Sequence, residues 1–190
     1  ARDRDVLATT VWPALLAAGG PVPSLPPGTA DDPGALLREP ATVCLLLDLM
    51  AFAEGAPPAD DTAPVQDRAA AELLRQHRRL RKAARGFAAL DNADRHRLRR
   101  RLKRLRYGVE ATQPLWPDKA CRHYLDGLRP LQDALGLCND LQVAQALLPT
   151  PDDEASRFAQ GWLKERQAQA ADAAAHALQH WPRAPKAWRS

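Results

Sequence analysis

The chain of 190 residues lacks several features, and each lack argues against a class of protein. No apolar run reaches the ~18 residues that a membrane-spanning helix needs. The longest run extends from Ala41 to Ala53 and is interrupted by Asp48. The three cysteines stand far apart and form no CxxC pair, which disfavours a cysteine-ligated zinc site and suits reduced thiols. We therefore expect a cytoplasmic protein without a membrane segment.

Strand-forming residues and catalytic motifs are also scarce. Val, Ile, Thr and aromatic residues are few, whereas Ala, Leu, Arg and Gln dominate. This composition predicts an all-α fold, built as an up-and-down helical bundle. The sequence shows no nucleophile with its base, no P-loop and no paired catalytic carboxylates. We therefore predict that the protein is not an enzyme and needs no cofactor or metal.

Proline, glycine and aspartate divide the chain into segments of helical composition. Two breaker-rich stretches, 19–34 and 55–64, predict loops. Pro40 lies near a helix start, and the run from Asp91 to Asp94 supplies a turn and an N-cap. Pro130 is expected to bend or divide the helix that contains it. The predicted helices span residues 3–18, 35–54, 65–88, 94–113, 118–148 and 152–181.

Positive charge is concentrated in one part of the chain. The formal net charge is only +4, yet residues 66–108 hold 15 of the 27 basic residues and only 4 of the 23 acidic ones. Thirteen of these 15 cations are Arg, whose planar guanidinium group suits bidentate contact with phosphate oxygens. The segment therefore indicates an anionic partner. The alternative is a solvated charged face that binds nothing.

A helical projection separates an apolar stripe from basic ones in both helices of this segment. In residues 94–113 the apolar stripe is Leu98, Leu102, Leu105 and Val109. One basic arc holds His96, Arg99, Arg100, Lys103, Arg106 and Tyr107. Most of the remaining circumference of the helix is occupied by Arg97, Arg101 and Arg104. In residues 66–88 the apolar stripe is Ala69, Leu73, Leu80, Ala84 and Phe87. The opposed basic stripe is Arg75, Arg78, Arg79, Lys82 and Arg85.

The short turn between these two helices predicts that they pack antiparallel, with basic faces flanking one groove. Nucleic acid is one candidate ligand, but single-strand binders add aromatic stacking platforms. The basic segment offers only Phe87, which the projection assigns to the core, and Tyr107. A polymer of bare phosphate needs dense cations and no stacking, so it is the preferred ligand. A third alternative is a phospho-accepting role of His96 or a phosphate-processing enzyme, and a metal-binding role of His96 is also open.

The run from His96 to Glu110 resembles the signature of the CHAD family, the conserved histidine α-helical domain, which is roughly HxxRxxxKxLRYxxE. A second family pattern, roughly LQxxLGxxND, is similar to the run from Leu131 to Asp140. The N-terminal ARDRDV sequence and Trp188 resemble two further family features. The resemblance implies two similar helical bundles around a basic cavity that binds inorganic polyphosphate without catalysis, and association with polyphosphate granules.

This resemblance and the projections together define the candidate site. The expected polyphosphate-binding residues are Arg75, Arg78, Arg79, Lys82, Arg85, His96, Arg99, Arg100, Lys103, Arg106, Tyr107 and Arg129. Four further residues, Glu110, Gln132, Asn139 and Asp140, are expected to orient the basic side chains. His77 projects near the apolar stripe, so a structural role is expected for it.

The chain departs from the family pattern at its beginning. It starts at Ala1 without an initiator Met or a signal peptide, and the family's earlier basic motif of the form HxxRVxxRRLR does not precede ARDRDV. We therefore expect a fragment, or a protein that a partner completes. On this interpretation residues 1–64 form part of a first bundle and residues 65–190 a second bundle that carries the basic helices.

Overall fold

A computed structural model describes residues 2–23, 32–55, 63–148 and 153–188. Every regular element within these residues is a helix, and none of them is in a strand. The prediction of an all-α helical bundle is therefore confirmed. The central parts of the two predicted loops, residues 24–31 and 56–62, lie outside the described residues.

The chain divides into two compact units, one of Pro27–Ala63 and one of Arg2–Pro26 with Pro64–Ser190. In the smaller unit, helix α3 (Pro33–Arg38) begins after Asp32, whose side chain accepts a hydrogen bond from the Gly34 amide at 2.9 Å. Helix α4 (Pro40–Glu54) starts at the predicted proline and is rich in Leu. None of its residues is buried.

The first helices belong to the larger unit. Helix α1 (Arg2–Val6), a π-helical turn (Leu7–Val11) and α2 (Trp12–Ala17) follow one another, which confirms the helix predicted over 3–18. Their apolar side chains enter a core cluster with Leu141 and Leu163. Contacts thus group Arg2–Pro26 with Pro64–Ser190, whereas a domain boundary at residue 64 stays a prediction from the resemblance.

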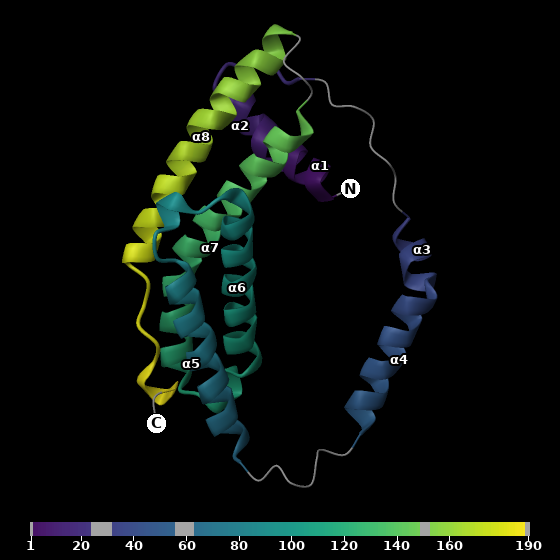
Figure 1. Cartoon of the computed structure of the whole chain (residues 1–190), viewed down its shortest axis with the longest axis vertical. Coiled ribbons are helices and arrows are strands. Elements are labelled where there is room, and N and C mark those ends of the chain that lie inside the picture. The colour runs from purple at the N-terminus through teal and green to yellow at the C-terminus, as the bar shows by residue number, and fades with distance from the viewer. Residues whose placement is uncertain (1, 24–31, 56–62, 149–152, 189–190) are drawn as a thin grey trace. The chain divides into compact units, whose positions relative to one another are not determined.

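Four long helices form the body of the larger unit (Figure 1). Helices α5 (Val65–Ala83), α6 (Asn92–Ala111) and α7 (Asp118–Leu147) lie side by side, and α8 (Glu154–Gln179) packs along α7. Helix α7 runs unbroken through Pro130, so the proline does not divide it. Pro130 is exposed, and the carbonyl group that loses its helical hydrogen bond can be hydrated there.

The turn between α5 and α6 is longer than the sequence predicted. Helix α5 ends at Ala83, five residues before the predicted end, and a short 3-10 helix covers Phe87–Ala89. Gly86 between them has φ 70°, a left-handed conformation that glycine adopts without steric cost. Asp91 then caps α6, since its Oδ1 accepts from the Asp94 amide at 2.7 Å. The N-cap predicted within residues 91–94 is thus Asp91, and α6 begins two residues before its predicted start at residue 94.

The core fixes which faces of α5 and α6 point outward. The predicted stripe of α6, from Leu98 to Val109, is at most 1% exposed, and α5 adds Leu73 and Leu80. His77 is also buried and lies 2.7 Å from the Tyr124 hydroxyl of α7 through its Nδ1 atom, which supports the structural role expected for it. Ala69 and Ala84, predicted as core, are only half-buried.

Candidate anion-binding surface

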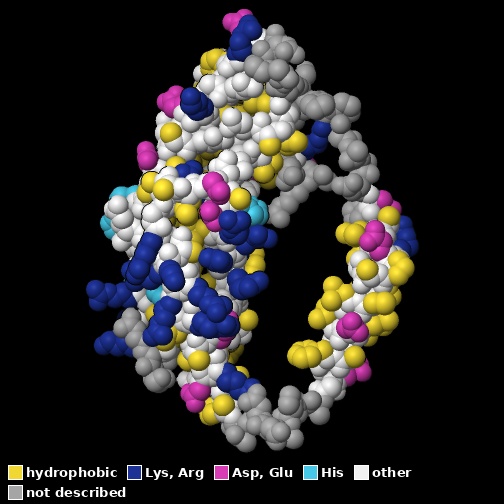
Figure 2. Space-filling model, in the orientation of Figure 1, with side chains coloured by type: hydrophobic (Ala, Val, Ile, Leu, Met, Phe, Trp, Pro, Cys, Tyr) yellow, Lys and Arg dark blue, Asp and Glu magenta, His cyan; other side chains and the backbone are white. Residues whose placement is uncertain are grey.

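Basic side chains gather over α5 and α6 on the face shown in Figure 2. Only one stripe of α6 faces the core. The cations of α6 therefore cover the rest of its circumference, from the side next to α7 to the side next to α5. Two depressions lie on either side of α6 and receive different subsets of these cations. We call them the motif cleft and the α5–α6 groove.

The motif cleft has a volume of about 790 Å³ and lies where α6 meets α7 near Val6 of α1. It brings together five of the predicted residues, His96, Arg99, Arg100, Asn139 and Asp140. Its further lining residues are Asn92, Ala93, Arg97, Gln142, Val143 and Ala146. Among these residues three arginines face one carboxylate, so the cleft carries a formal charge of +2 before any protonation of histidine.

A chain of hydrogen bonds holds His96 in this cleft. The Asn139 amide donates to Asp140 Oδ1 at 3.3 Å, and its Oδ1 lies 2.8 Å from His96 Nδ1. With that oxygen as acceptor, His96 donates through Nδ1 and leaves Nε2 for a ligand. A neutral ring presents a lone pair at Nε2, whereas a protonated ring presents a donor that suits a phosphate oxygen. Asn139 therefore contacts the histidine directly, and Asp140 contacts Asn139.

A second polar link between α6 and α7 holds Arg106. Its Nε donates to Glu110 Oε1 and its Nη1 donates to Gln132 Oε1, both at 2.7 Å. The side chains of Arg106 and Glu110 are each about 38% exposed, so the guanidinium group is held in place while one side of it still meets solvent. Glu110 and Gln132 thus both contact Arg106, and their role in ligand binding stays a prediction.

The α5–α6 groove, of about 620 Å³, holds a different set of cations. Arg75, Arg79 and Lys82 of α5 face Arg101 and Arg104 of α6. The expected single groove between the two predicted basic faces is therefore not what forms, because the face of α6 that meets α5 is the Arg101 face and not the His96 face. The groove carries five cations and one carboxylate, Glu72, which gives a formal charge of +4.

The helices can form this groove because they approach closely at Gly108. A Cβ atom on that residue would lie 3.0 Å from Leu73 Cδ2 of α5, which is tighter than most side-chain contacts. Glycine at this point lets α5 lie against α6, so the long arginine side chains stand on the two rims. The spacing of the two basic helices thus depends on one small residue.

The remaining predicted residues lie apart from both depressions. Arg78 and Arg85 line a cavity on another side of α5, beside Arg81 and Trp181, and Lys82 borders that cavity as well. Lys103 is half-buried and Tyr107 is 55% exposed. Both belong to the arc of α6 that we call the His96 arc, which consists of His96, Arg99, Arg100, Lys103, Arg106 and Tyr107. Arg129 is exposed on α7, one turn before Gln132.

Sequence reasoning passed over some lining residues. The predicted site does not include Arg97, Arg101 or Arg104. In the structure, Arg97 lines the motif cleft, and Arg101 and Arg104 line the groove. The signal for the last two was their basic spacing on one face of the helix, but nothing in the sequence said which helix would cover it. Gln142 of the cleft gave no signal at all.

The described part of the chain holds no cluster of three or more His, Cys, Asp or Glu residues that suits a metal ion. It also contains no helix with the length and apolar character needed to cross a bilayer. What the structure presents is an all-α bundle whose central helix carries cations on all sides that the core does not cover. Such a surface has the charge that an anionic ligand requires.

Comparison with known protein families identifies the family of this chain. The family described as the CHAD domain matches residues 1–149, so this chain belongs to the CHAD domain family. Domains of this family in general bind polyphosphate and are non-catalytic. The match covers the helices up to the end of α7, and the similarity noted at Trp188 lies outside it. No curated protein and no solved structure matches the chain.

Proposed function

We propose that this protein binds inorganic polyphosphate without transforming it, through the motif cleft and the His96 arc of α6. The observation that supports the proposal most strongly is the cleft itself. It places His96, Arg99 and Arg100 around one depression of about 790 Å³. Arg106, held by Glu110 and Gln132, extends the same arc along the helix.

The chemistry of the surface favours bare phosphate over nucleic acid. A polyphosphate chain offers one negative charge or more per unit and nothing else to recognise, so dense guanidinium groups suffice. Sequence-tolerant nucleic-acid binding adds aromatic platforms for the bases. Among the described residues of α5, α6 and their turn, Phe87 is buried and Tyr107 is the only exposed aromatic side chain. The surface therefore has the cations of a nucleic-acid binder without the stacking groups.

A competition titration tests this proposal. Long-chain polyphosphate and single-stranded DNA of equal total charge are titrated into the protein at physiological ionic strength, and each is then used to displace the other. We expect polyphosphate to bind more tightly and to displace the DNA, with an affinity that falls steeply as salt rises, because each neutralised phosphate releases counterions. Equal or tighter binding of DNA would overturn the proposal in favour of a non-specific nucleic-acid binder.

A separate measurement addresses the alternative role of His96. The His96→Ala variant and the unchanged protein are incubated with polyphosphate, and orthophosphate release and phosphate labelling of the protein are followed. We expect neither protein to release or acquire phosphate, and the variant to bind polyphosphate more weakly, because it lacks the imidazole that lines the motif cleft. Turnover or labelling that depends on His96 would contradict a purely binding role. Association with polyphosphate granules is the cellular counterpart of this proposal.

A further inference from the structure

We infer that the α5–α6 groove is a second phosphate-binding segment, which a long polyphosphate chain reaches by crossing α6 from the motif cleft. This inference rests on the proposed function and adds to it a dependence on chain length. The groove is the more cationic of the two depressions, with a formal charge of +4 among its lining residues against +2 in the cleft. Its α6 residues, Arg101 and Arg104, lie at positions that the family pattern HxxRxxxKxLRYxxE leaves unspecified.

The two depressions are joined by arginines across the surface of α6. Arg97 and Arg100 line the motif cleft, whereas Arg101 and Arg104 line the groove. Residues four apart on a helix are neighbours, about 5–6 Å apart at Cβ. Arg97 with Arg101 and Arg100 with Arg104 therefore form two bridges from one depression to the other. A polyanion that extends from the motif cleft to the groove therefore passes from one arginine to the next, with no apolar surface between them.

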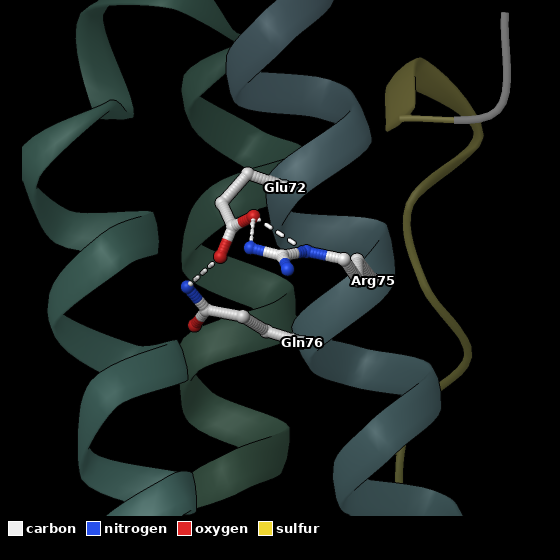
Figure 3. A network of polar contacts seen from close by, with 3 residues as sticks. All are labelled: Glu72, Arg75 and Gln76. Atoms are coloured by element: carbon white, nitrogen blue, oxygen red, sulfur yellow. Dashed lines mark hydrogen bonds and ion pairs between the residues drawn. The ribbon is translucent and has the colours of Figure 1, made fainter.

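The groove already holds a carboxylate in the manner expected for a phosphate oxygen. Glu72 accepts an ion-paired hydrogen bond from the Arg75 guanidinium group and a hydrogen bond of 2.8 Å from Gln76 Nε2 (Figure 3). These two contacts lower the pKa of Glu72, first through Gln76 and then through Arg75, so it is ionised at neutral pH. The buried Oε1 atom of Gln76 has no hydrogen-bond partner within the described residues.

The other four cations of the groove, Arg79, Lys82, Arg101 and Arg104, are exposed. In the described part of the chain none of them forms an ion pair within 4.0 Å. Glu72 thus neutralises one end of a groove whose remaining charge is unmatched. A polyanion supplies the missing negative charge and competes with Glu72 for Arg75.

Chain length separates the two segments experimentally. A helix with its side chains is about 10–12 Å across, so tripolyphosphate fills one depression only, whereas a long chain can occupy both. Two linked binding segments raise the affinity above that of either one, since the second contact becomes intramolecular. The groove should therefore contribute to the binding of long polyphosphate and add little to that of tripolyphosphate.

The experiment compares three double variants of the full chain by titration with tripolyphosphate and with long-chain polyphosphate. The groove variant is Arg101→Gln with Arg104→Gln, and the cleft variant is Arg99→Gln with Arg100→Gln. The control is Lys119→Gln with Lys164→Gln, which removes two exposed cations that line neither depression. Gln is nearly as good a helix former as Arg or Lys, and circular dichroism verifies that the helices persist.

For the groove variant we expect the Kd for long polyphosphate to rise about tenfold or more, with little change for tripolyphosphate. Its salt dependence with the long chain should also be shallower, by roughly 0.7 in the logarithmic slope for each phosphate that the protein no longer neutralises. The cleft variant should bind both ligands more weakly. A further variant, Glu72→Gln, should bind the long chain about two- to fivefold more tightly, because it frees Arg75.

The possible failures are distinguishable. The inference of a second segment that only long chains reach is overturned if the groove variant weakens long-chain binding no more than the control, or if it weakens tripolyphosphate binding equally. The same conclusion follows if Glu72→Gln lowers the affinity for the long chain. If instead the cleft variant keeps the binding of the unchanged protein, the proposed function of the motif cleft fails, whatever the groove variant does.

Discussion

Helix α6 should become more stable when one of its arginines is neutralised, although the same change weakens binding. Arg100 is exposed, and the described residues provide it with no ion pair. Of its four neighbours one turn away, Arg97, Lys103 and Arg104 are cations and the fourth is His96. Each like-charged pair on a helix costs about 0.2–0.5 kcal/mol, so three pairs amount to roughly 0.6–1.5 kcal/mol. Arg97 is partly neutralised by Asp94 at 2.5 Å, which favours the lower half of this range.

We therefore expect Arg100→Gln to raise the free energy of unfolding by about 0.5–1 kcal/mol at low salt, or the midpoint temperature by roughly 1–4 °C. The assay is urea and thermal unfolding followed by circular dichroism at low and at high salt. Because screening weakens exposed charge pairs, the gain should shrink as salt rises. The matched control is Lys164→Gln on α8, since no charged residue lies three or four positions from Lys164.

Two outcomes would refute this reasoning. An Arg100→Gln variant that is no more stable than the unchanged protein at low salt would show that the cations of α6 do not strain the fold. A gain that persists unchanged at high salt would show that its cause is not electrostatic. The expected combination, higher stability with weaker polyphosphate binding, is typical of residues retained for function.

Three further predictions concern the packing that positions this surface. Tyr124→Phe should lower the free energy of unfolding by about 0.5–1.5 kcal/mol at neutral pH, because it removes the hydrogen bond with His77, as urea unfolding can measure. Burial raises the pKa of Tyr124 in the folded protein, so the tyrosine of the unfolded chain ionises first. The protein should therefore lose stability as pH rises through about 10, and the Tyr124→Phe variant should lose less. Equal losses of stability in the two proteins would contradict this expectation. Gly108→Val should destabilise the fold by about 1–3 kcal/mol, because it overpacks the contact with Leu73. The control is Gly136→Val, since a Cβ atom at Gly136 meets nothing within 4 Å. Equal effects of the two variants would contradict the close approach of α5 and α6 at Gly108. Leu105→Ala should cost about 2–5 kcal/mol in urea unfolding, and a cost below 1 kcal/mol would show that the α6 stripe is not core.

Much of the fold followed from the sequence because local patterns determine it. The stripe from Leu98 to Val109 recurs at helical spacing, and all four of its residues are buried. An N-cap was expected within the run from Asp91 to Asp94, and Asp91 caps α6. Pro130 was harder to interpret, because a proline interrupts a helix only when its missing hydrogen bond cannot be replaced, and its exposure in α7 is a tertiary property.

The site was predictable in part for the same reason. A projection gives the angle of each side chain around α6, so the arc from His96 to Arg106 could be drawn from the sequence. It does not say which neighbouring helix covers which side, and α5 turned out to lie against the Arg101 face. The contact of Asn139 with His96 joins residues 43 positions apart, and no local pattern indicates it.

The most direct test of the account is the affinity of one charge-reversal variant for long polyphosphate. Arg99→Glu with Lys103→Glu reverses two cations on the His96 arc, and Lys119→Glu with Lys164→Glu makes the same change in net charge elsewhere. The account predicts that the first variant keeps its helical circular dichroism and loses binding, while the second still binds with at most a modest loss. Equal affinities of the two variants would contradict it, because binding would then depend on net charge and not on this face of α6.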